Sequence, residues 1–298
     1  MIPGLLSRTT PDPGDNGLPG LHRVPIWFND PLNWKGPDGL LAYTSEHIVY
    51  TIVVLAVAMV IAVPLGLLIG HTGRGSAAIG GSVNALRAVP PLGLLILLIA
   101  VISPHIHIAQ GFTYLIARGS VPYFIPAMAV LLVLAISPIL TSTYAGVQAI
   151  DPAVRDAARG MGMRPVQVVT RVEFPNALPL IMSGMRSATL QVIATMTVAA
   201  YAPLVGGLGR LIVNGDQDLT SLRYGYPAMV AGGITVAVLA LAAEGLLALL
   251  QRRVVSRGIT GRYSTRREKY ERHPPAASRG ARAGSARRMR RSGQLSHT

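Results

Sequence analysis

Long apolar stretches alternate with short polar segments along the middle of the chain. Each stretch reaches roughly 20 residues or more, the length of helix that crosses the hydrocarbon core of a bilayer. Five membrane-spanning helices are therefore predicted, at residues 47–70, 77–102, 122–150, 177–202 and 226–250. The second stretch contains Arg87 and the pair Pro90-Pro91, so we expect either one kinked helix or a short helix followed by a broken one. A chain with six spans is the alternative.

The composition agrees with a membrane protein. Half of the 298 residues are apolar and only 13% are charged, which is too apolar and too poor in charge for an ordinary soluble domain. The expected fold class is therefore an all-α, polytopic bundle of transmembrane helices, with residues 47–250 as its transmembrane domain. The sequence has no cysteine, which excludes disulfides, thiolate nucleophiles and thiolate metal ligands.

Basic residues are distributed unevenly between the predicted loops. With five spans and an outside N-terminus, 19 of the 27 Lys and Arg residues fall on the cytoplasmic side and six on the outer side, while Arg87 and Arg186 lie within spans. Because basic residues are enriched in cytoplasmic segments, the loop 151–176 and the C-terminal tail 251–298 are expected in the cytoplasm. The N-terminal segment 1–46 is expected outside, and its Trp27 and Trp34 are suited to the membrane interface.

The tail 251–298 carries 14 basic residues and almost no large apolar ones. It cannot bury enough apolar surface to fold alone, so disorder is expected. Attraction to anionic membrane lipid is compatible with disorder. Binding to nucleic acid is disfavoured, because only Tyr263 and Tyr270 could stack on bases.

The loop 151–176 begins with the signals of a short amphipathic helix. The Asp151 side chain can cap free amides, and Pro152 suits the first helical position. Gly160 and Gly162 are expected to end this helix. Its apolar residues recur at positions i, i+3, i+4 and i+7, which places them on one face: Val154, Ala157, Ala158 and Met161.

A second short helix is predicted to follow the glycines. The pair Arg164-Pro165 begins it, and Phe174-Pro175 is expected to stop it before the fourth span. Its apolar residues repeat the same spacing: Pro165, Val168, Val169 and Val172. The apolar faces of two helices in an aqueous loop need a partner. Packing against the protein's own spans, docking in a groove on a cytosolic partner and a DNA-binding helix-turn-helix are the three alternatives.

The order of residues in this loop resembles the "EAA" loop of ABC-importer permeases. That loop has Glu-Ala-Ala, then Gly, then Ile-x-Leu-Pro, at the spacings of Asp156-Ala157-Ala158, Gly162 and the run from Val172 to Pro175. Asp for Glu, Val for Ile and Phe for Leu are conservative replacements. Residues 84–95, 137–163 and 204–212 are also similar to permeases that import glycine betaine, choline, carnitine and related compatible solutes.

The resemblance implies a type I permease fold and a permease subunit of an ATP-driven importer for quaternary-ammonium solutes in a bacterial cell membrane. It implies a separate cytoplasmic ATPase that binds ATP and Mg, a second permease subunit that is identical or similar, and an extracytoplasmic solute-binding protein. An importer of methionine or another amino acid is the alternative, and a membrane scaffold or signalling protein is a remote one. The ATPase-coupling positions carried over are Asp156, Ala157, Ala158, Gly162, Met163, Pro165, Val172 and Pro175.

Gly206, Gly207 and Gly209 form a cluster on the predicted outer side. A tight turn is one interpretation, and the resemblance suggests a gate that lines the translocation path. Tyr144 and Tyr201 are the aromatic residues well inside predicted spans, but they fall at opposite ends of the membrane and cannot form one cage for a quaternary ammonium ion. The resemblance leaves the selection of solute to the separate binding protein.

No catalytic or cofactor site is expected in this chain. A phosphate-binding loop of the form G-x-x-x-x-G-K-[ST] is absent, because neither Lys35 nor Lys269, the two lysines, follows a glycine. His105 and His107 lack a third ligand nearby, so no metal site is expected.

Two further kinds of feature lie inside the predicted spans. Gly66 and Gly70 have the spacing typical of close helix packing. Arg87, Arg186 and Glu244 are ionisable groups within spans, which often mark functional sites. All three lie toward the cytoplasmic ends of their spans, where long side chains can also reach water.

Overall fold

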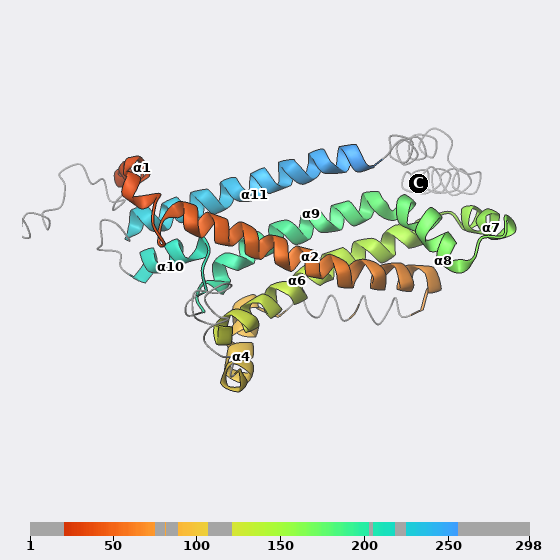
Figure 1. Ribbon diagram of the computed structural model, residues 1–298, viewed down its shortest axis with the longest axis horizontal. Helices are drawn as coiled ribbons and strands as arrows, with labels where there is room; N and C mark the ends of the chain where they lie inside the picture. The colour runs from red at the N-terminus through yellow and green to blue at the C-terminus, as the bar shows by residue number, and fades with distance from the viewer. Residues whose placement is uncertain are drawn as a thin grey trace, which may run out of the picture. The chain divides into compact units, whose positions relative to one another are not determined.

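The computed structural model describes residues 21–74, 81, 89–106, 121–202, 205–217 and 225–255. Every regular element in these ranges is a helix (Figure 1), so the predicted all-α class is confirmed. Some predictions concern residues outside these ranges: Arg87, His107, the first 20 residues and the tail beyond Val255.

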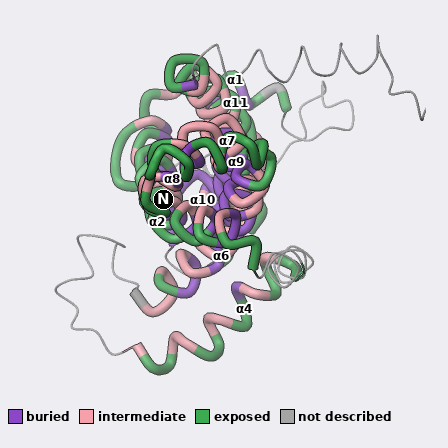
Figure 2. The backbone as a smooth tube through the Cα atoms, turned by 90° about the vertical axis from the view of Figure 1, so that its right-hand side faces the viewer, coloured by how far each residue is buried: buried purple, intermediate pink, exposed green. Residues whose placement is uncertain are grey.

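Three long helices form the main core. They are α2 (Leu40–Thr72), α6 (Val121–Gln148) and α9 (Phe174–Ala199). Figure 2 shows the buried residues gathered where these helices meet. This apolar cluster contains both small and large side chains, among them Ala58, Leu131, Ile139, Val192 and Met196.

Two glycines let α2 approach α6 closely, as their spacing predicts. A Cβ atom at Gly66 would lie 2.6 Å from the Cβ of Thr143, and one at Gly70 would lie 2.5 Å from the Cβ of Val147. Both distances are far below ordinary contact between carbon atoms. Neither position therefore has room for a methyl group, and the prediction of close packing is confirmed.

The second predicted span is interrupted at its proline pair. Helix α4 (Pro91–Ile102) begins at the second proline, and Pro90 has an extended backbone with φ −61° and ψ 124°, as expected for a residue that precedes proline. A short 3-10 helix, η3 (Ser103–His105), follows α4. With 12 residues, α4 is about 18 Å long and too short to cross the hydrocarbon core alone.

Within the described ranges, three helices are long and apolar enough to cross a membrane: α2, α6 and α11 (Tyr226–Val254). Helix α9 has 26 residues, but polar residues such as Arg186 and Gln191 lower its hydropathy. Helix α9 lies where the fourth span is predicted. Its mean hydropathy is lower than that of the three helices named above, so hydropathy alone does not identify it as a span. The count of five spans stays a prediction.

A second apolar cluster lies at the N-terminal end of α2. It joins α1 (Val24–Asn29) to α2, to α10 (Gly209–Gln217) and to the first turns of α11. Its buried residues are Trp27, Leu40, Tyr43, Leu208, Leu211, Ala228 and Ala231. Two 3-10 helices, η1 (Leu21–Arg23) and η2 (Pro31–Asn33), flank α1.

This cluster shows what surrounds Trp27 and where α2 begins. Trp27 is 4% exposed, so its ring packs inside the protein. Helix α2 begins at Leu40, before the predicted span at residues 47–70. The helix extends through polar residues because Leu40 and Tyr43 pack in the cluster and because Glu46 and His47 find hydrogen-bonding partners far along the chain.

Candidate functional site

The loop 151–176 starts with a capped helix, as predicted. The Asp151 carboxylate accepts a hydrogen bond from the backbone N–H of Ala153 at 3.0 Å. Helix α7 (Pro152–Gly160) follows with proline in its first turn. This cap satisfies one of the free amides that every helix start leaves.

A glycine turn ends α7, also as predicted. Gly162 has φ +80°, a backbone conformation that favours glycine. Its N–H donates to the carbonyl of Arg159 at 2.9 Å, and the N–H of Met163 donates to the carbonyl of Ala158 at 3.2 Å. These two bonds close the helix in the manner of a Schellman motif and reverse the chain direction.

The second helix does not stop where the sequence predicts. Helix α8 (Pro165–Val168) continues into a π-helical turn, η5 (Val169–Glu173), and this turn continues into α9. The prediction that Phe174-Pro175 ends the helix is therefore wrong.

The π-turn explains how a helix can run through Pro175. Proline lacks an N–H and its ring crowds the carbonyl four residues earlier, and a π-turn just before it relieves this conflict by widening the helix. The side chain of Asn176 donates to the carbonyl of Val172 at 2.7 Å, which satisfies an acceptor in the widened turn. The loop is thus joined to α9 by continuous helix.

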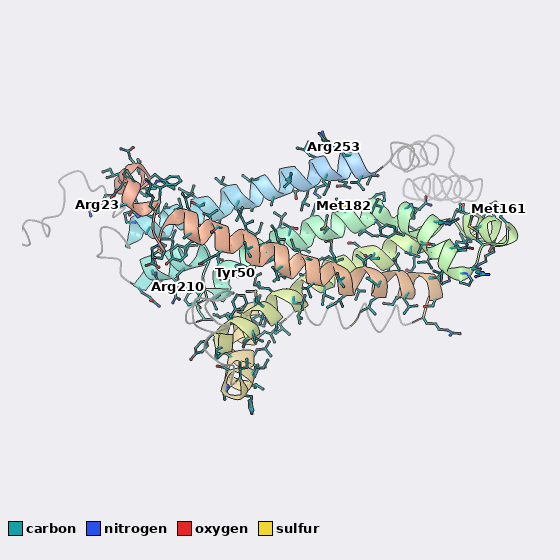
Figure 3. All side chains as sticks on the ribbon, viewed as in Figure 1. Arg23, Tyr50, Met161, Met182, Arg210 and Arg253 are labelled. Atoms are coloured by element: carbon teal, nitrogen blue, oxygen red, sulfur yellow. The ribbon has the colours of Figure 1, made fainter. Side chains whose placement is uncertain are left out.

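The two short helices leave some apolar residues exposed, which we call the loop tip, and bury others, which we call its base. Val154, Met161 and Val166 are 37%, 71% and 72% exposed, and Figure 3 shows Met161 at the tip. Ala158 and Val168 are buried, at 2% and 0% exposed. Packing against the protein's own helices therefore accounts for the base of the loop but leaves the tip without a partner among the described residues.

The carried-over coupling positions divide in the same way. Asp156, Ala157, Gly162 and Pro165 are exposed, whereas Ala158 is buried. The remaining three are half-buried: Met163, Val172 and Pro175. Asp156 approaches Arg159 at 3.8 Å in an exposed pair, which contributes little to stability.

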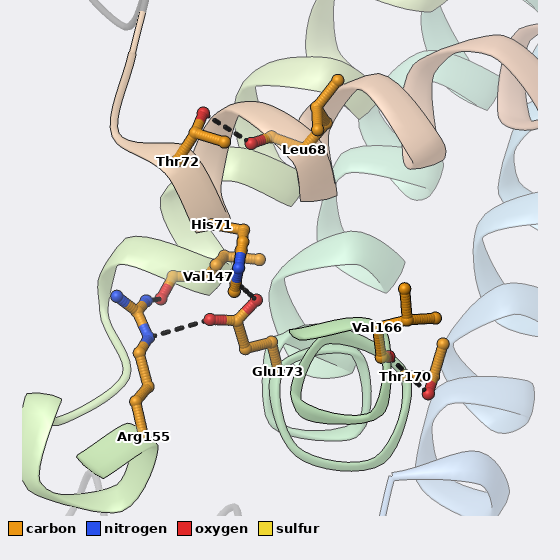
Figure 4. Close-up of polar contacts among 8 residues, drawn as sticks. All are labelled: Leu68, His71, Thr72, Val147, Arg155, Val166, Thr170 and Glu173. Carbon is orange, nitrogen blue, oxygen red and sulfur yellow. Dashed lines mark hydrogen bonds and ion pairs between the residues drawn. The ribbon is translucent and has the colours of Figure 1, made fainter. Parts of the chain in front are cut away.

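Glu173 is a functional candidate that the sequence interpretation missed. Its side chain is fully buried and lies between His71 at the end of α2 and Arg155 of α7 (Figure 4). The His71 Nδ1 is 2.9 Å from one carboxylate oxygen and the Arg155 Nε is 3.0 Å from the other. Arg155 also donates to the carbonyl of Val147 in the last turn of α6. Removing one partner of such a buried ion pair typically destabilises a fold by about 3–5 kcal/mol.

A signal for this cluster was present in the sequence. Glu173 follows Val169 by four residues and Val172 by one, so it falls on the apolar face of the second helix. An acidic residue on an apolar face needs a buried partner. Sequence spacing gave no means of identifying that partner, because His71 lies 102 residues earlier.

Gly206, Gly207 and Gly209 form a tight turn that packs against α2 and α9. Gly207 has φ +92° and its N–H donates to a Glu46 carboxylate oxygen at 3.0 Å. A Cβ atom at Gly209 would lie 2.6 Å from the Cα of Thr197. Both the positive φ and the close approach require glycine.

His47 holds the same turn from inside the protein. The N–H of Leu208 donates to its Nδ1 at 3.3 Å, and its Nε2 lies 3.2 Å from the carbonyl of Ile193 in α9. Because Nδ1 accepts, Nε2 carries the hydrogen and donates to that carbonyl. The neutral ring therefore joins α2, α9 and the turn.

Tyr144 and Tyr201 are not brought together. The backbone carbonyl of Tyr144 lies beside Gly70, near the end of α2, whereas Tyr201 is 54% exposed and follows α9. The glycine turn contacts residues 46 and 47, which a helix rise of 1.5 Å per residue places about 35 Å from Gly70. Tyr144 therefore lies near one end of α2, and the glycine turn lies near the other.

Arg186 of α9 and Glu244 of α11 form an ion pair through a hydrogen bond from the guanidinium to the carboxylate. About a third of each side chain is exposed. These two charges inside predicted spans thus lie beside each other with opposite signs, as ionisable groups at membrane depth usually do.

Residues 62–256 match the family described as "Binding-protein-dependent transport system inner membrane component". The chain belongs to this family. The match runs from within α2 to the end of α11 and includes the entire loop 151–176. The protein is therefore a membrane permease component of a binding-protein-dependent transport system.

Relatives of this permease are also permease subunits. It is 29% identical over 223 residues to the glycine betaine/carnitine/choline transport system permease protein of Bacillus subtilis (strain 168), with 74% of this chain and 91% of the relative covered. It is 32% identical over 221 residues to the carnitine transport permease protein of Listeria monocytogenes, with 74% and 90% covered.

Among solved structures, the permease resembles a chain of the MetNI methionine ABC transporter in an inward-facing conformation. The TM-score is 0.57 and the sequence identity 22%, over 73% of this chain and 96% of that chain. At this identity the likeness is one of fold alone. It confirms the predicted ABC-importer permease fold.

Proposed function

We propose that this permease is the membrane subunit of an ATP-driven importer for quaternary-ammonium compatible solutes such as glycine betaine, choline and carnitine. The names of these relatives support this solute class, and they favour it over methionine, which rests on a likeness of fold. ATP-driven uptake of glycine betaine into vesicles, with methionine as competitor, tests the proposal.

The observation that carries the proposal is the exposed apolar tip of the loop 151–176. Val154, Met161 and Val166 are exposed on two helices that are held at their base by buried residues. Exposed apolar side chains on a polar loop are suited to docking against another protein. We assign this tip as the docking surface for a cytoplasmic ATPase subunit.

The coupling positions take two roles in this proposal. Asp156, Ala157, Gly162 and Pro165 are exposed and contact the ATPase, where Asp156 pairs with a basic side chain. Ala158, Met163, Val172 and Pro175 are wholly or partly buried and shape the loop. ATP and Mg bind to the ATPase, so the permease itself is not an enzyme and holds no cofactor.

The permease works with two further partners in this proposal. A second permease subunit, identical or similar, completes the translocation path, and an extracytoplasmic binding protein delivers the solute. The glycine turn at Gly206, Gly207 and Gly209 is proposed as part of the gate on that side. Its ties to Glu46 and His47 would transmit movement of α2 to the turn.

The proposed orientation puts the loop tip and the C-terminus in the cytoplasm and α10 outside. The cysteine-free chain allows a direct test with single cysteines at two exposed positions. Asp216→Cys in α10 should react with a membrane-impermeant maleimide in intact cells, because that position faces the outside. Val166→Cys, whose native side chain is 72% exposed, should react only after the membrane is opened, in cells that express the permease without the ATPase. Labelling of Val166→Cys in intact cells would refute this orientation.

A further inference from the structure

Four helical segments meet at the base of the loop 151–176 around one carboxylate. Glu173 lies in the π-turn that leads into α9, His71 lies in the last turn of α2, and Arg155 lies in α7. Arg155 also donates to the carbonyl of Val147 near the end of α6. Figure 4 shows the three side chains converging on this point from separate segments.

The burial of this cluster makes its geometry specific. The side chain of Glu173 is 0% exposed, and those of His71 and Arg155 are 18% and 19% exposed. Because the carboxylate is buried from water, its charge has to be balanced by side chains of the protein such as these two. A movement of α7 that separates Arg155 from Glu173 would leave a buried charge unpaired, so α7 and the ends of α2 and α6 are held in fixed positions.

We propose that Glu173 is a positioning residue for energy coupling. It fixes the docking helix α7 to the ends of α2, α6 and α9, so that a movement imposed on α7 is passed to the transmembrane helices. This inference rests on the proposed docking of an ATPase at the loop tip. It adds that docking and transmission are separate tasks, performed by the exposed tip and by the buried base.

The central test is Glu173→Gln, which keeps the size of the side chain and one acceptor oxygen but removes its charge. The exposed tip is unchanged, so the ATPase should still co-purify with the permease. Solute imported per ATP hydrolysed should fall about tenfold or more, measured with glycine betaine in vesicles. An unchanged ratio of import to hydrolysis would overturn the proposal.

Three further variants separate positioning from folding. The double variant Arg155→Met with Glu173→Met removes both charges, so its thermal stability should recover relative to Arg155→Met alone, while its ratio of import to hydrolysis should stay low. Arg159→Met is the matched control, because Arg159 lies one turn further along α7 in an exposed pair, and it should leave that ratio unchanged. If the ratio recovers together with thermal stability, Glu173 serves only the fold and the proposal is wrong.

A readout without any partner protein keeps this inference separate from the proposed function. Spin labels at Thr72→Cys and Gly160→Cys, both exposed positions, report the distance between the end of α2 and the end of α7. Glu173→Gln should broaden the distribution of this distance. An unchanged distribution would refute the positioning role even if import is confirmed. If the wild type imports no solute, the proposed function fails, while the distance distribution still decides whether Glu173 fixes α7.

Discussion

Met161→Asp should abolish ATP-driven uptake while leaving the permease folded in the membrane. The Met161 side chain is 71% exposed at the tip of the loop, so a polar replacement does not disturb the core of the permease. In the docked complex, Asp would lose the apolar burial of Met and place an unpaired charge in an apolar groove. The combined loss is at least about 3 kcal/mol, which is about a hundredfold in affinity for the ATPase.

The measurement is the amount of ATPase that co-purifies with the permease, taken together with uptake. Met161→Leu is the matched control, because Leu keeps the volume and apolar character of Met and should preserve both. Normal co-purification of the ATPase with Met161→Asp would show that the loop tip is not the docking surface.

Gly162→Val should also reduce uptake strongly, through the shape of the loop. Gly162 has φ +80°, and a β-branched residue in that conformation is strained by about 1–3 kcal/mol. The turn must therefore open or shift, which moves α7 relative to α8. We expect the binding of the ATPase to weaken about tenfold, the change that corresponds to 1.4 kcal/mol.

Gly160→Val provides the comparison for this prediction. Gly160 is the last residue of α7, and neither glycine has a heavy atom within 4 Å of the position of an added Cβ. The two variants thus add the same side chain to equally open positions and differ in backbone conformation. Equal loss of uptake in both would show that the added bulk matters and that the turn does not.

The local structure of the loop could be predicted because its signals are local. Asp151-Pro152 starts α7, and Gly162 turns the chain, through contacts within a few residues. The same locality explains the error at Phe174-Pro175. A proline normally ends the preceding helix, but here a π-turn and the side chain of Asn176 accommodate it. A motif of single residues does not show a change of helix type.

The polar contacts that join distant segments could not be predicted from spacing. Glu46 and His47 support a turn 161 residues later, and Glu173 pairs with His71 across 102 residues. For this reason the part of α2 that precedes the predicted span was not recognised as helix, and the cluster at the base of the loop was missed. The positions of α2, α6 and α11 could be predicted from hydropathy, because a long apolar stretch is visible in the sequence without knowledge of distant contacts.

The central claim is that this permease imports quaternary-ammonium solutes with energy from a separate ATPase. Its most direct test is uptake of radiolabelled glycine betaine into proteoliposomes that contain the permease with its co-purified ATPase and are supplied with the partner binding protein. Uptake should require ATP on the ATPase side, should be competed by excess choline or carnitine, and should be unaffected by excess methionine. Competition by methionine alone, or uptake that continues without ATP, would contradict the claim.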